Sequence, residues 1–229
     1  MEKKEYAPPL RGIIFDLDGT LYQMKWFFKP LLTMMLLPQS LLLPRYMKVR
    51  KRYAGKEHEC GESLLLALAE DLAVQNGTGN SRQMHQWIHR RFYRAFESAM
   101  PLLRGSRPGL QQTLSRLRGS GIKLAVLSDF DRVTQRLRGL HISPDLFDTL
   151  ASTESLGCLK PSPKSFLSIA EQWNIQPQHI LVIGDRSDTD GAGAHNSGMR
   201  FVQITDSPLK NSNALCWKQI RTLLHSFVS

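Results

Sequence analysis

The sequence predicts a protein of the α/β class, with a parallel sheet flanked by helices and a second, mainly helical part. Three observations predict it. Short apolar runs such as Ile13–Phe15 and Ile180–Ile183 are typical of parallel strands that are covered on both faces. Segments with a helical period separate these runs in the second half of the chain. Two runs end on closely spaced carboxylates, which favours a Rossmann-like sheet with ligands at the carboxyl ends of its strands.

The first strand ends on the motif D-L-D-G-T, residues 16–20. A turn at Gly19 lets the carboxylates of Asp16 and Asp18 converge on one small volume. The Asp16 carboxylate can attack phosphorus and form an acyl phosphate. The Asp18 carboxyl group can give a proton to the departing oxygen and later take one from water. The plainer alternative is a strand that ends in an ordinary Asp-Gly turn.

The remaining core elements alternate between helix and strand, and three of their ends carry polar residues of interest. Ser128 follows a strand, Lys160 precedes a helix for which Ser162 is the candidate N-cap and Pro163 the first residue, and Asp185 follows another strand. The predicted elements are helix 107–119, strand 122–127, helix 131–140, strand 147–151, helix 163–173, strand 180–184, helix 190–197, strand 200–204 and a terminal helix. Such alternation predicts right-handed crossovers in one parallel sheet.

Four motifs occur in order: D-L-D-G-T, L-S-D, K-P and G-D-R-S-D-T-D-G-A-G. With them the chain resembles the haloacid dehalogenase superfamily over residues 12–20 and about 105–205. The likeness is to its phosphatase branch, of the phosphoglycolate phosphatase and beta-phosphoglucomutase type, in which a helical cap follows the first motif. Any one of the later motifs is weak alone, but the four together are specific.

The resemblance assigns roles to the metal-binding acids. Asp16 is the expected nucleophile, and Asp16, Asp18 and Asp185 are the expected ligands of one Mg²⁺, an ion that prefers oxygen. The resemblance implies that Asp18 contributes its backbone carbonyl and keeps its carboxyl group for proton transfer. Asp190 is the expected second acid of the last motif, in the second shell of the metal. It is preferred to Asp188 because G-A-G-A-H-N-S-G-M follows it like the helix that ends this motif in the family.

The resemblance also assigns the contacts to the phosphoryl group. Lys160 is expected to hold the nucleophile and the phosphoryl group, since a carboxylate that attacks an anion needs a cation beside it. Ser128 is expected to donate its hydroxyl, and Asp129 its backbone N–H, to a phosphoryl oxygen. Asp129 stands where relatives often have Asn, which is tolerable if its backbone alone is used. The alternative for Lys160 is an ordinary solvated lysine.

We expect two domains: an α/β catalytic core of residues 1–20 and 105–229, and a helical cap of residues 21–104. The cap carries apolar residues at helical spacing, such as Leu64, Leu68 and Leu72. Its segment 26–44 is unusually apolar, but Lys29, two prolines, Gln39 and Ser40 interrupt it, so no run reaches the ~20 residues of a membrane span. Buried cap helices are favoured over a segment that touches lipid.

The chain has a formal net charge of +10, with 30 Lys and Arg against 20 Asp and Glu. Five of these cations lie close together in the cap: Arg45, Lys48, Arg50, Lys51 and Arg52. The favoured interpretation is a solvated basic helix face. The alternatives are a surface for nucleic acid or anionic membrane, and a positive field that steers an anionic substrate inward.

The histidines and cysteines give weaker signals. His85 and His89 have a spacing typical of zinc ligands, but a solvated helix face is favoured because no His-Glu-x-x-His pattern accompanies them. Three scattered cysteines without C-x-x-C spacing indicate a reducing, cytoplasmic setting. The N-terminus has no apolar stretch typical of a secretory signal.

The predicted function is Mg²⁺-dependent hydrolysis of a small phosphorylated metabolite through an aspartyl phosphate on Asp16. One alternative is a phosphomutase of the same superfamily. Another is a protein that binds nucleic acid or anionic membrane through its basic cap. The four motifs contact only the phosphoryl group and its metal, so the substrate and the oligomeric state stay open.

Overall fold

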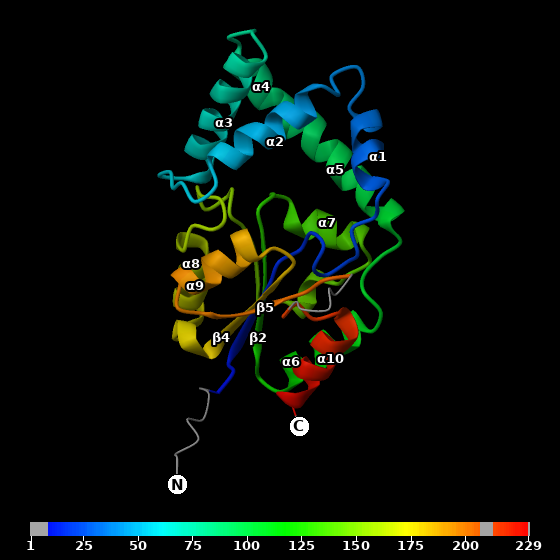
Figure 1. Ribbon diagram of the computed structural model, residues 1–229, viewed down its shortest axis with the longest axis vertical. Helices are drawn as coiled ribbons and strands as arrows, with labels where there is room; N and C mark the ends of the chain where they lie inside the picture. The colour runs from blue at the N-terminus through cyan, green and yellow to red at the C-terminus, as the bar shows by residue number, and fades with distance from the viewer. Residues whose placement is uncertain (1–8, 207–212, 229) are drawn as a thin grey trace.

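The computed structural model describes residues 9–206 and 213–228. Its sheet has five parallel strands in the order β3-β2-β1-β4-β5 (Figure 1). They are β1 (Gly12–Phe15), β2 (Lys123–Ser128), β3 (Thr149–Ser152), β4 (Ile180–Gly184) and β5 (Arg200–Gln203). The strand order reverses beside β1, where an open α/β sheet binds its ligands. The predicted fold class is confirmed.

Helices cover both faces of this sheet, and the side chains of β1 show why. Ile13 and Phe15 belong to one hydrophobic cluster and Ile14 to another, since successive side chains of a strand point to opposite faces. The first cluster takes side chains from α6 (Leu110–Gly119), α7 (Val133–Gly139) and α10 (Trp217–Ser226). The second takes them from α8 (Lys164–Trp173) and α9 (Ala192–Asn196). Three single turns complete the core, at Pro144–Leu146, Pro177–His179 and Ser187–Gly191.

Residues 21–104, all of them described, form a helical insert without a named strand at the carboxyl end of the sheet (Figure 1). The insert contains α1 (Phe28–Met35), α2 (Leu42–Arg52), α3 (Gly61–Gln75), α4 (Ser81–Trp87), a π-helical turn (Ile88–Phe92), α5 (Tyr93–Ala99) and a 3₁₀ turn (Met100–Leu103). Its buried side chains belong to the same cluster as those of α6 and α7. Insert and sheet therefore share one apolar core on this face.

The apolar segment 26–44 is only partly buried, so the expectation of buried helices is wrong for half of it. Phe28 and Leu32 of α1 face the core, whereas Trp26 is 88% and Met34 61% exposed. The reason is that α1 is covered mainly by α5, which leaves its outer side in solvent. Among the described residues, no helix combines the length and the apolar character that crossing a bilayer requires.

The basic cluster of α2 does not form one solvated face, and this expectation is wrong for Arg50. Tyr46, Val49 and Arg50 lie on one stripe of the helix, at i, i+3 and i+4, and all three are buried. The guanidinium of Arg50 is paired with Glu154, which follows β3 in the core. Arg52 remains at the surface, where it is paired with Asp71 at 2.9 Å.

Glu154 connects the core to the insert through several hydrogen bonds. Its carboxylate accepts from Arg50, from the hydroxyl of Tyr46 at 3.2 Å and from the hydroxyl of Tyr93. The guanidinium of Arg50 also donates to the backbone oxygen of Asp129 at 2.6 Å and stacks on Phe130, 4.1 Å from the ring centroid. Because charge and hydrogen bonds are both satisfied, this buried pair holds α2 and α5 against the ends of β2 and β3.

We predict that Glu154→Ala lowers the free energy of unfolding by about 3–5 kcal/mol, because it leaves the Arg50 cation buried without a partner. Urea unfolding followed by circular dichroism measures the loss. The matched control is Asp71→Ala, which breaks the exposed pair with Arg52 and should cost about 1 kcal/mol or less. Losses of similar size in the two variants would show that the buried pair does not hold the insert to the core.

Candidate active site

The carboxyl ends of β1, β2 and β4 meet around the side chain of Lys160. Its ammonium group donates to Asp16 at 2.8 Å, to Asp190 at 2.7 Å and to the backbone oxygen of Leu127 at 2.7 Å. Lys160 is 3% exposed, so it is not an ordinary solvated lysine. Thr20 donates to the other oxygen of the Asp16 carboxylate at 3.0 Å. Residues far apart in the chain therefore form one buried ionic cluster.

Burial and charge act in opposite directions on the two central groups. Burial raises the pKa of Asp16 well above its usual value, Lys160 lowers it, and the neighbouring carboxylates raise it further. Burial alone would lower the pKa of Lys160, but Asp16 and Asp190 more than reverse that effect and raise it. Lys160 is therefore a fixed cation, while Asp16 needs more positive charge than Lys160 supplies.

A third carboxylate, Asp185, forms no ion pair with any residue that the structure describes. One oxygen each from Asp16, Asp185 and Asp190 lie within 4.8 Å of one another. No side-chain donor within residues 9–206 and 213–228 bonds to the Asp185 carboxylate. Burial, followed by the charges of Asp190 and Asp18, raises the pKa of Asp185 to about 6. Gly19 keeps this space open: its φ is +84°, and a Cβ there would lie 2.5 Å from an Asp185 oxygen.

These residues fit a divalent cation with a preference for oxygen. Three carboxylates face one ammonium, which leaves an excess of negative charge in a buried place. Asp190 is the least available of the three, because one of its oxygens accepts from Lys160 and the other from the backbone N–H of Arg186 at 3.3 Å. Asp16 and Asp185 are therefore the more available carboxylates for a divalent ion.

The Asp18 carboxylate points away from this carboxylate group. It accepts from the Tyr22 hydroxyl at 2.6 Å, from the guanidinium of Arg136 and from the Ser128 hydroxyl at 3.4 Å. The family resemblance implies that Asp18 reaches the metal through its backbone carbonyl, and the Asp18 side chain is not part of the group formed by Asp16, Asp185 and Asp190. Its carboxyl group is held in place by these three donors.

Ser128 is the last residue of β2 and Asp129 follows it, and the two lie between Asp18 and Lys160. The Ser128 oxygen accepts from Arg136 at 3.0 Å and from the backbone N–H of Phe130 at 3.2 Å. One oxygen of the Asp129 carboxylate accepts from the Thr153 hydroxyl at 2.9 Å and from the backbone N–H of Lys160 at 3.0 Å. The acid at position 129 thus positions the lysine loop.

Asp188, the competing acid of the last motif, is at the surface. Its carboxylate pairs with Arg186 at 2.7 Å, and its side chain is 69% exposed. Asp190, by contrast, is buried against Gly184, where a Cβ would lie 2.4 Å from the Asp190 carboxyl carbon.

Two arginines of this site were not among the residues predicted from the sequence. Arg136 of α7 is fully buried, contacts Asp18 and Ser128, and stacks on Phe96 at 4.3 Å from the ring centroid. Arg107 donates to the backbone oxygens of Gly19 and Thr20, both at 2.7 Å, and so holds the loop that carries Asp18. Their sequence context gives no signal, since arginines in helices and loops usually face solvent.

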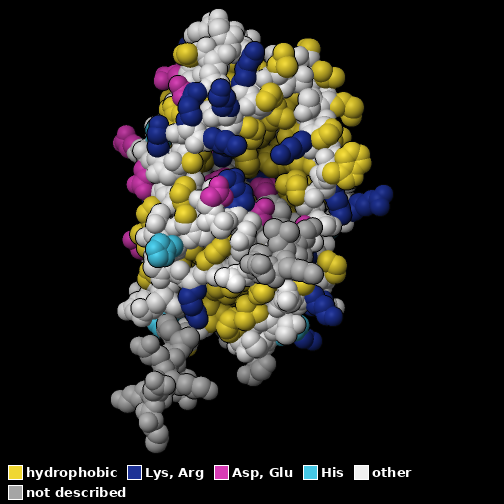
Figure 2. Space-filling model, viewed as in Figure 1, with side chains coloured by type: hydrophobic (Ala, Val, Ile, Leu, Met, Phe, Trp, Pro, Cys, Tyr) yellow, Lys and Arg dark blue, Asp and Glu magenta, His cyan; other side chains and the backbone are white. Residues whose placement is uncertain are grey.

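The space-filling view shows a hollow between the insert and the sheet core (Figure 2). Acidic side chains lie in it, hydrophobic side chains line its upper part, and Lys and Arg side chains gather on the insert beside it. On this face the acidic side chains are therefore open to solvent between insert and core, beside positive charge.

The fold and this cluster define an α/β enzyme with acids and one lysine at the carboxyl ends of its strands. A family model described as haloacid dehalogenase-like hydrolase matches residues 10–198, and the chain belongs to this family. Phosphoglycolate phosphatase of Nitrosospira multiformis is 29% identical over 192 residues, which cover 83% of this chain and 81% of that protein. Glyceraldehyde 3-phosphate phosphatase of Pyrococcus abyssi is 34% identical over 96 residues, which are 42% of this chain and only 40% of that protein.

Solved structures agree on the fold. The HAD-hydrolase YfnB of Bacillus subtilis, solved bound to magnesium, has a TM-score of 0.64 and 16% identity, with 95% of this chain and 99% of that chain covered. At this identity the likeness shows the fold alone. The family model and the phosphatase names of the sequence relatives together support a phosphatase enzyme.

We predict that the apparent affinity for Mg²⁺ falls as the pH drops below about 6. The Asp185 pKa is raised to about 6, so below that pH a proton occupies the carboxylate that a metal needs. If the metal displaces one proton, its apparent binding constant falls by up to about tenfold for each pH unit below about 6. Above about pH 7 the binding constant should change little with pH. Calorimetric titration with Mg²⁺ across this range measures the slope. Asp188→Asn is the matched control and should give the wild-type profile, whereas a flat wild-type profile would contradict the role of Asp185.

Proposed function

We propose that this enzyme is a Mg²⁺-dependent phosphatase that hydrolyses small phosphomonoesters through an aspartyl phosphate on Asp16. The observation that carries the proposal is the Asp16 carboxylate, buried at the end of β1 between the Lys160 ammonium and the Asp185 carboxylate, for which the described part of the chain offers no ion-pair partner. A carboxylate that attacks a phosphate anion requires cations beside both the carboxylate and the phosphoryl group, because the two anions repel each other. Asp16, Asp185 and the backbone carbonyl of Asp18 would hold the metal, with Asp190 behind them.

The proposed reaction has two steps. In the first, an oxygen of Asp16 bonds to phosphorus, the ester P–O bond breaks, and Asp18 gives its proton to the leaving oxygen. In the second, Asp18 takes a proton from water as the water oxygen attacks phosphorus. The bond between Asp16 and phosphorus breaks, and inorganic phosphate leaves. When bound, Mg²⁺ supplies positive charge to the phosphoryl oxygens.

The other residues keep these two acids in place. Lys160 offsets the charge of Asp16, and Arg136 and Tyr22 fix the direction of the Asp18 carboxyl group. The Ser128 hydroxyl and the backbone N–H of Asp129 would donate to phosphoryl oxygens. Arg136 adds a buried cation on the phosphoryl side of the site, which the sequence did not indicate.

We also propose that residues 21–104 act as a cap over a catalytic core of residues 1–20 and 105–229. The insert lies at the carboxyl end of the sheet, where it limits access to the carboxylates (Figure 1). Hydrolysis is preferred to a phosphomutase reaction because the sequence relatives with more than four fifths coverage carry phosphatase names. The three free cysteines support a reducing, cytoplasmic location.

We predict that Asp16→Asn reduces hydrolysis of an aryl phosphate to background, because an amide does not attack phosphorus. Release of inorganic phosphate in the presence of Mg²⁺ measures it, and EDTA should abolish the wild-type activity until Mg²⁺ is added back. Asp188→Asn removes an exposed carboxylate nearby and should keep the wild-type rate. Near-normal turnover by Asp16→Asn would disprove the aspartyl phosphate.

A second variant tests the proton donor. Asp18→Asn should slow hydrolysis of an alkyl phosphate far more than that of a nitrophenyl phosphate, because only the alkoxide needs a proton to leave; the ratio of the two losses should be about 10²–10⁴. Steady-state rates on both substrates measure the ratio. Equal losses would mean that Asp18 acts only through the fold or the metal.

A further inference from the structure

Two histidines and one glutamate meet inside the helical insert, apart from the carboxylate site. Glu62 lies in the first turn of α3, His85 in the last turn of α4, and His89 in the π-helical turn that follows. One ligand atom of each lies within 4.8 Å of the other two. The insert folds as a hairpin here, with α3 packed against α4, so residues more than twenty positions apart face one another.

The ring nitrogen Nε2 of His85 is the central atom of this cluster. It lies 3.1 Å from a Glu62 oxygen, is shielded from solvent, and makes no hydrogen bond within the described residues. The rings of His85 and His89 stand edge to face, with centroids 4.6 Å apart. The Glu62 oxygen is close enough to pair with a protonated His85 but makes no hydrogen bond with it, which leaves the shielded nitrogen unsatisfied, and a cation between the nitrogen and the carboxylate would satisfy both.

The spacing of these atoms suits a transition metal. Two ligands at about 2.1 Å from a tetrahedral ion lie roughly 3.4 Å apart, close to the separation of His85 and Glu62. The backbone at His89 is fixed, because its carbonyl oxygen accepts from Arg132 of the core at 2.8 Å. π-Helical turns are rare and often occur at functional sites.

We propose that Glu62, His85 and His89 bind one divalent transition-metal ion, with Zn²⁺ as the best fit. Imidazole nitrogen selects zinc-like ions over Mg²⁺, which requires oxygen ligands. Glu62 is largely exposed, so the fourth position is open to water. The ion would tie the start of α3 to the junction of α4 and α5 and so stabilise the insert. This site is independent of the proposed phosphatase reaction.

The experiment titrates the full-length protein with Co²⁺, a spectroscopic substitute for Zn²⁺, in the presence of excess Mg²⁺. We expect one equivalent to bind with the intense visible absorption of a four-coordinate ion, and Zn²⁺ to displace it. Zn²⁺ should also raise the melting temperature. His85→Gln and His89→Gln should each weaken binding by roughly 100-fold or more, and Glu62→Gln by at least about tenfold, since even outer-shell partners contribute 10–100-fold.

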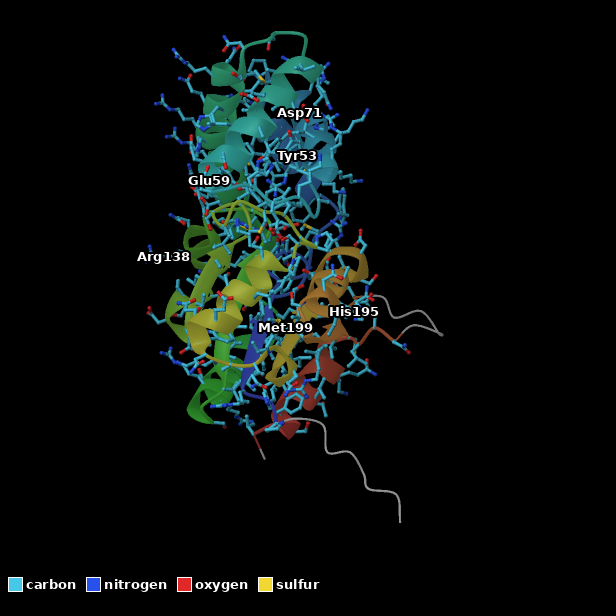
Figure 3. All side chains as sticks on the ribbon, turned by 90° about the vertical axis from the view of Figure 1, so that its left-hand side faces the viewer. Tyr53, Glu59, Asp71, Arg138, His195 and Met199 are labelled. Carbon is cyan, nitrogen blue, oxygen red and sulfur yellow. The ribbon has the colours of Figure 1, made fainter. Side chains whose placement is uncertain are left out.

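Two controls separate this site from others. His195→Ala removes an exposed histidine of the core. Glu59 lies two residues before α3 and so marks the proposed site in Figure 3, where His195 is labelled well away from it. Its binding should equal that of the wild type. Asp185→Asn weakens the carboxylate site and should leave the Co²⁺ spectrum unchanged. Absence of the spectrum in the wild-type protein, or its loss in Asp185→Asn with retention in His85→Gln, would overturn the proposal.

Discussion

The ammonium group of Lys160 is the point at which three strands of the sheet meet. It bonds to Asp16 after β1, to the backbone of Leu127 in β2 and to Asp190 after β4. Without it, two carboxylates would face each other in a buried space, which is costly. Because parallel strands end at the same edge, one buried cation can fix the direction of acids that are distant in sequence. Asp18 is held separately, by Arg136 and Tyr22.

A second buried ion pair sets the place of the insert. Glu154 lies two residues after β3, and Arg50 lies in α2, so their pairing joins the edge of the sheet to the insert. Arg50 also reaches the backbone of Asp129, beside the expected phosphoryl position. The same arginine thus connects the insert to the loop that would bind phosphate. A shift of the insert would therefore change the position of that loop.

The sequence was informative where function depends on local pattern. Asp16, Ser128 and Asp185 follow apolar runs, and their closeness depends only on strand order in a parallel sheet. Burial of charged helix residues is different, because it depends on what packs against the helix. Arg50 and Arg136 look like solvent-facing residues in sequence, yet aromatic rings and carboxylates from other elements enclose them. The prediction that segment 26–44 is buried was wrong on its outer side for the converse reason, since few neighbours cover α1.

The topology also sets the order in which the protein can be made. β1 is the central strand and leaves the ribosome first, but its partners β2 and β4 begin at Lys123 and Ile180. Ile13, Ile14 and Phe15 therefore stay without sheet partners while more than a hundred further residues are synthesised. Pairing across such distances is slow, and an apolar strand with two open edges invites aggregation. In the finished sheet β1 is paired on both sides, so this exposure exists only during synthesis.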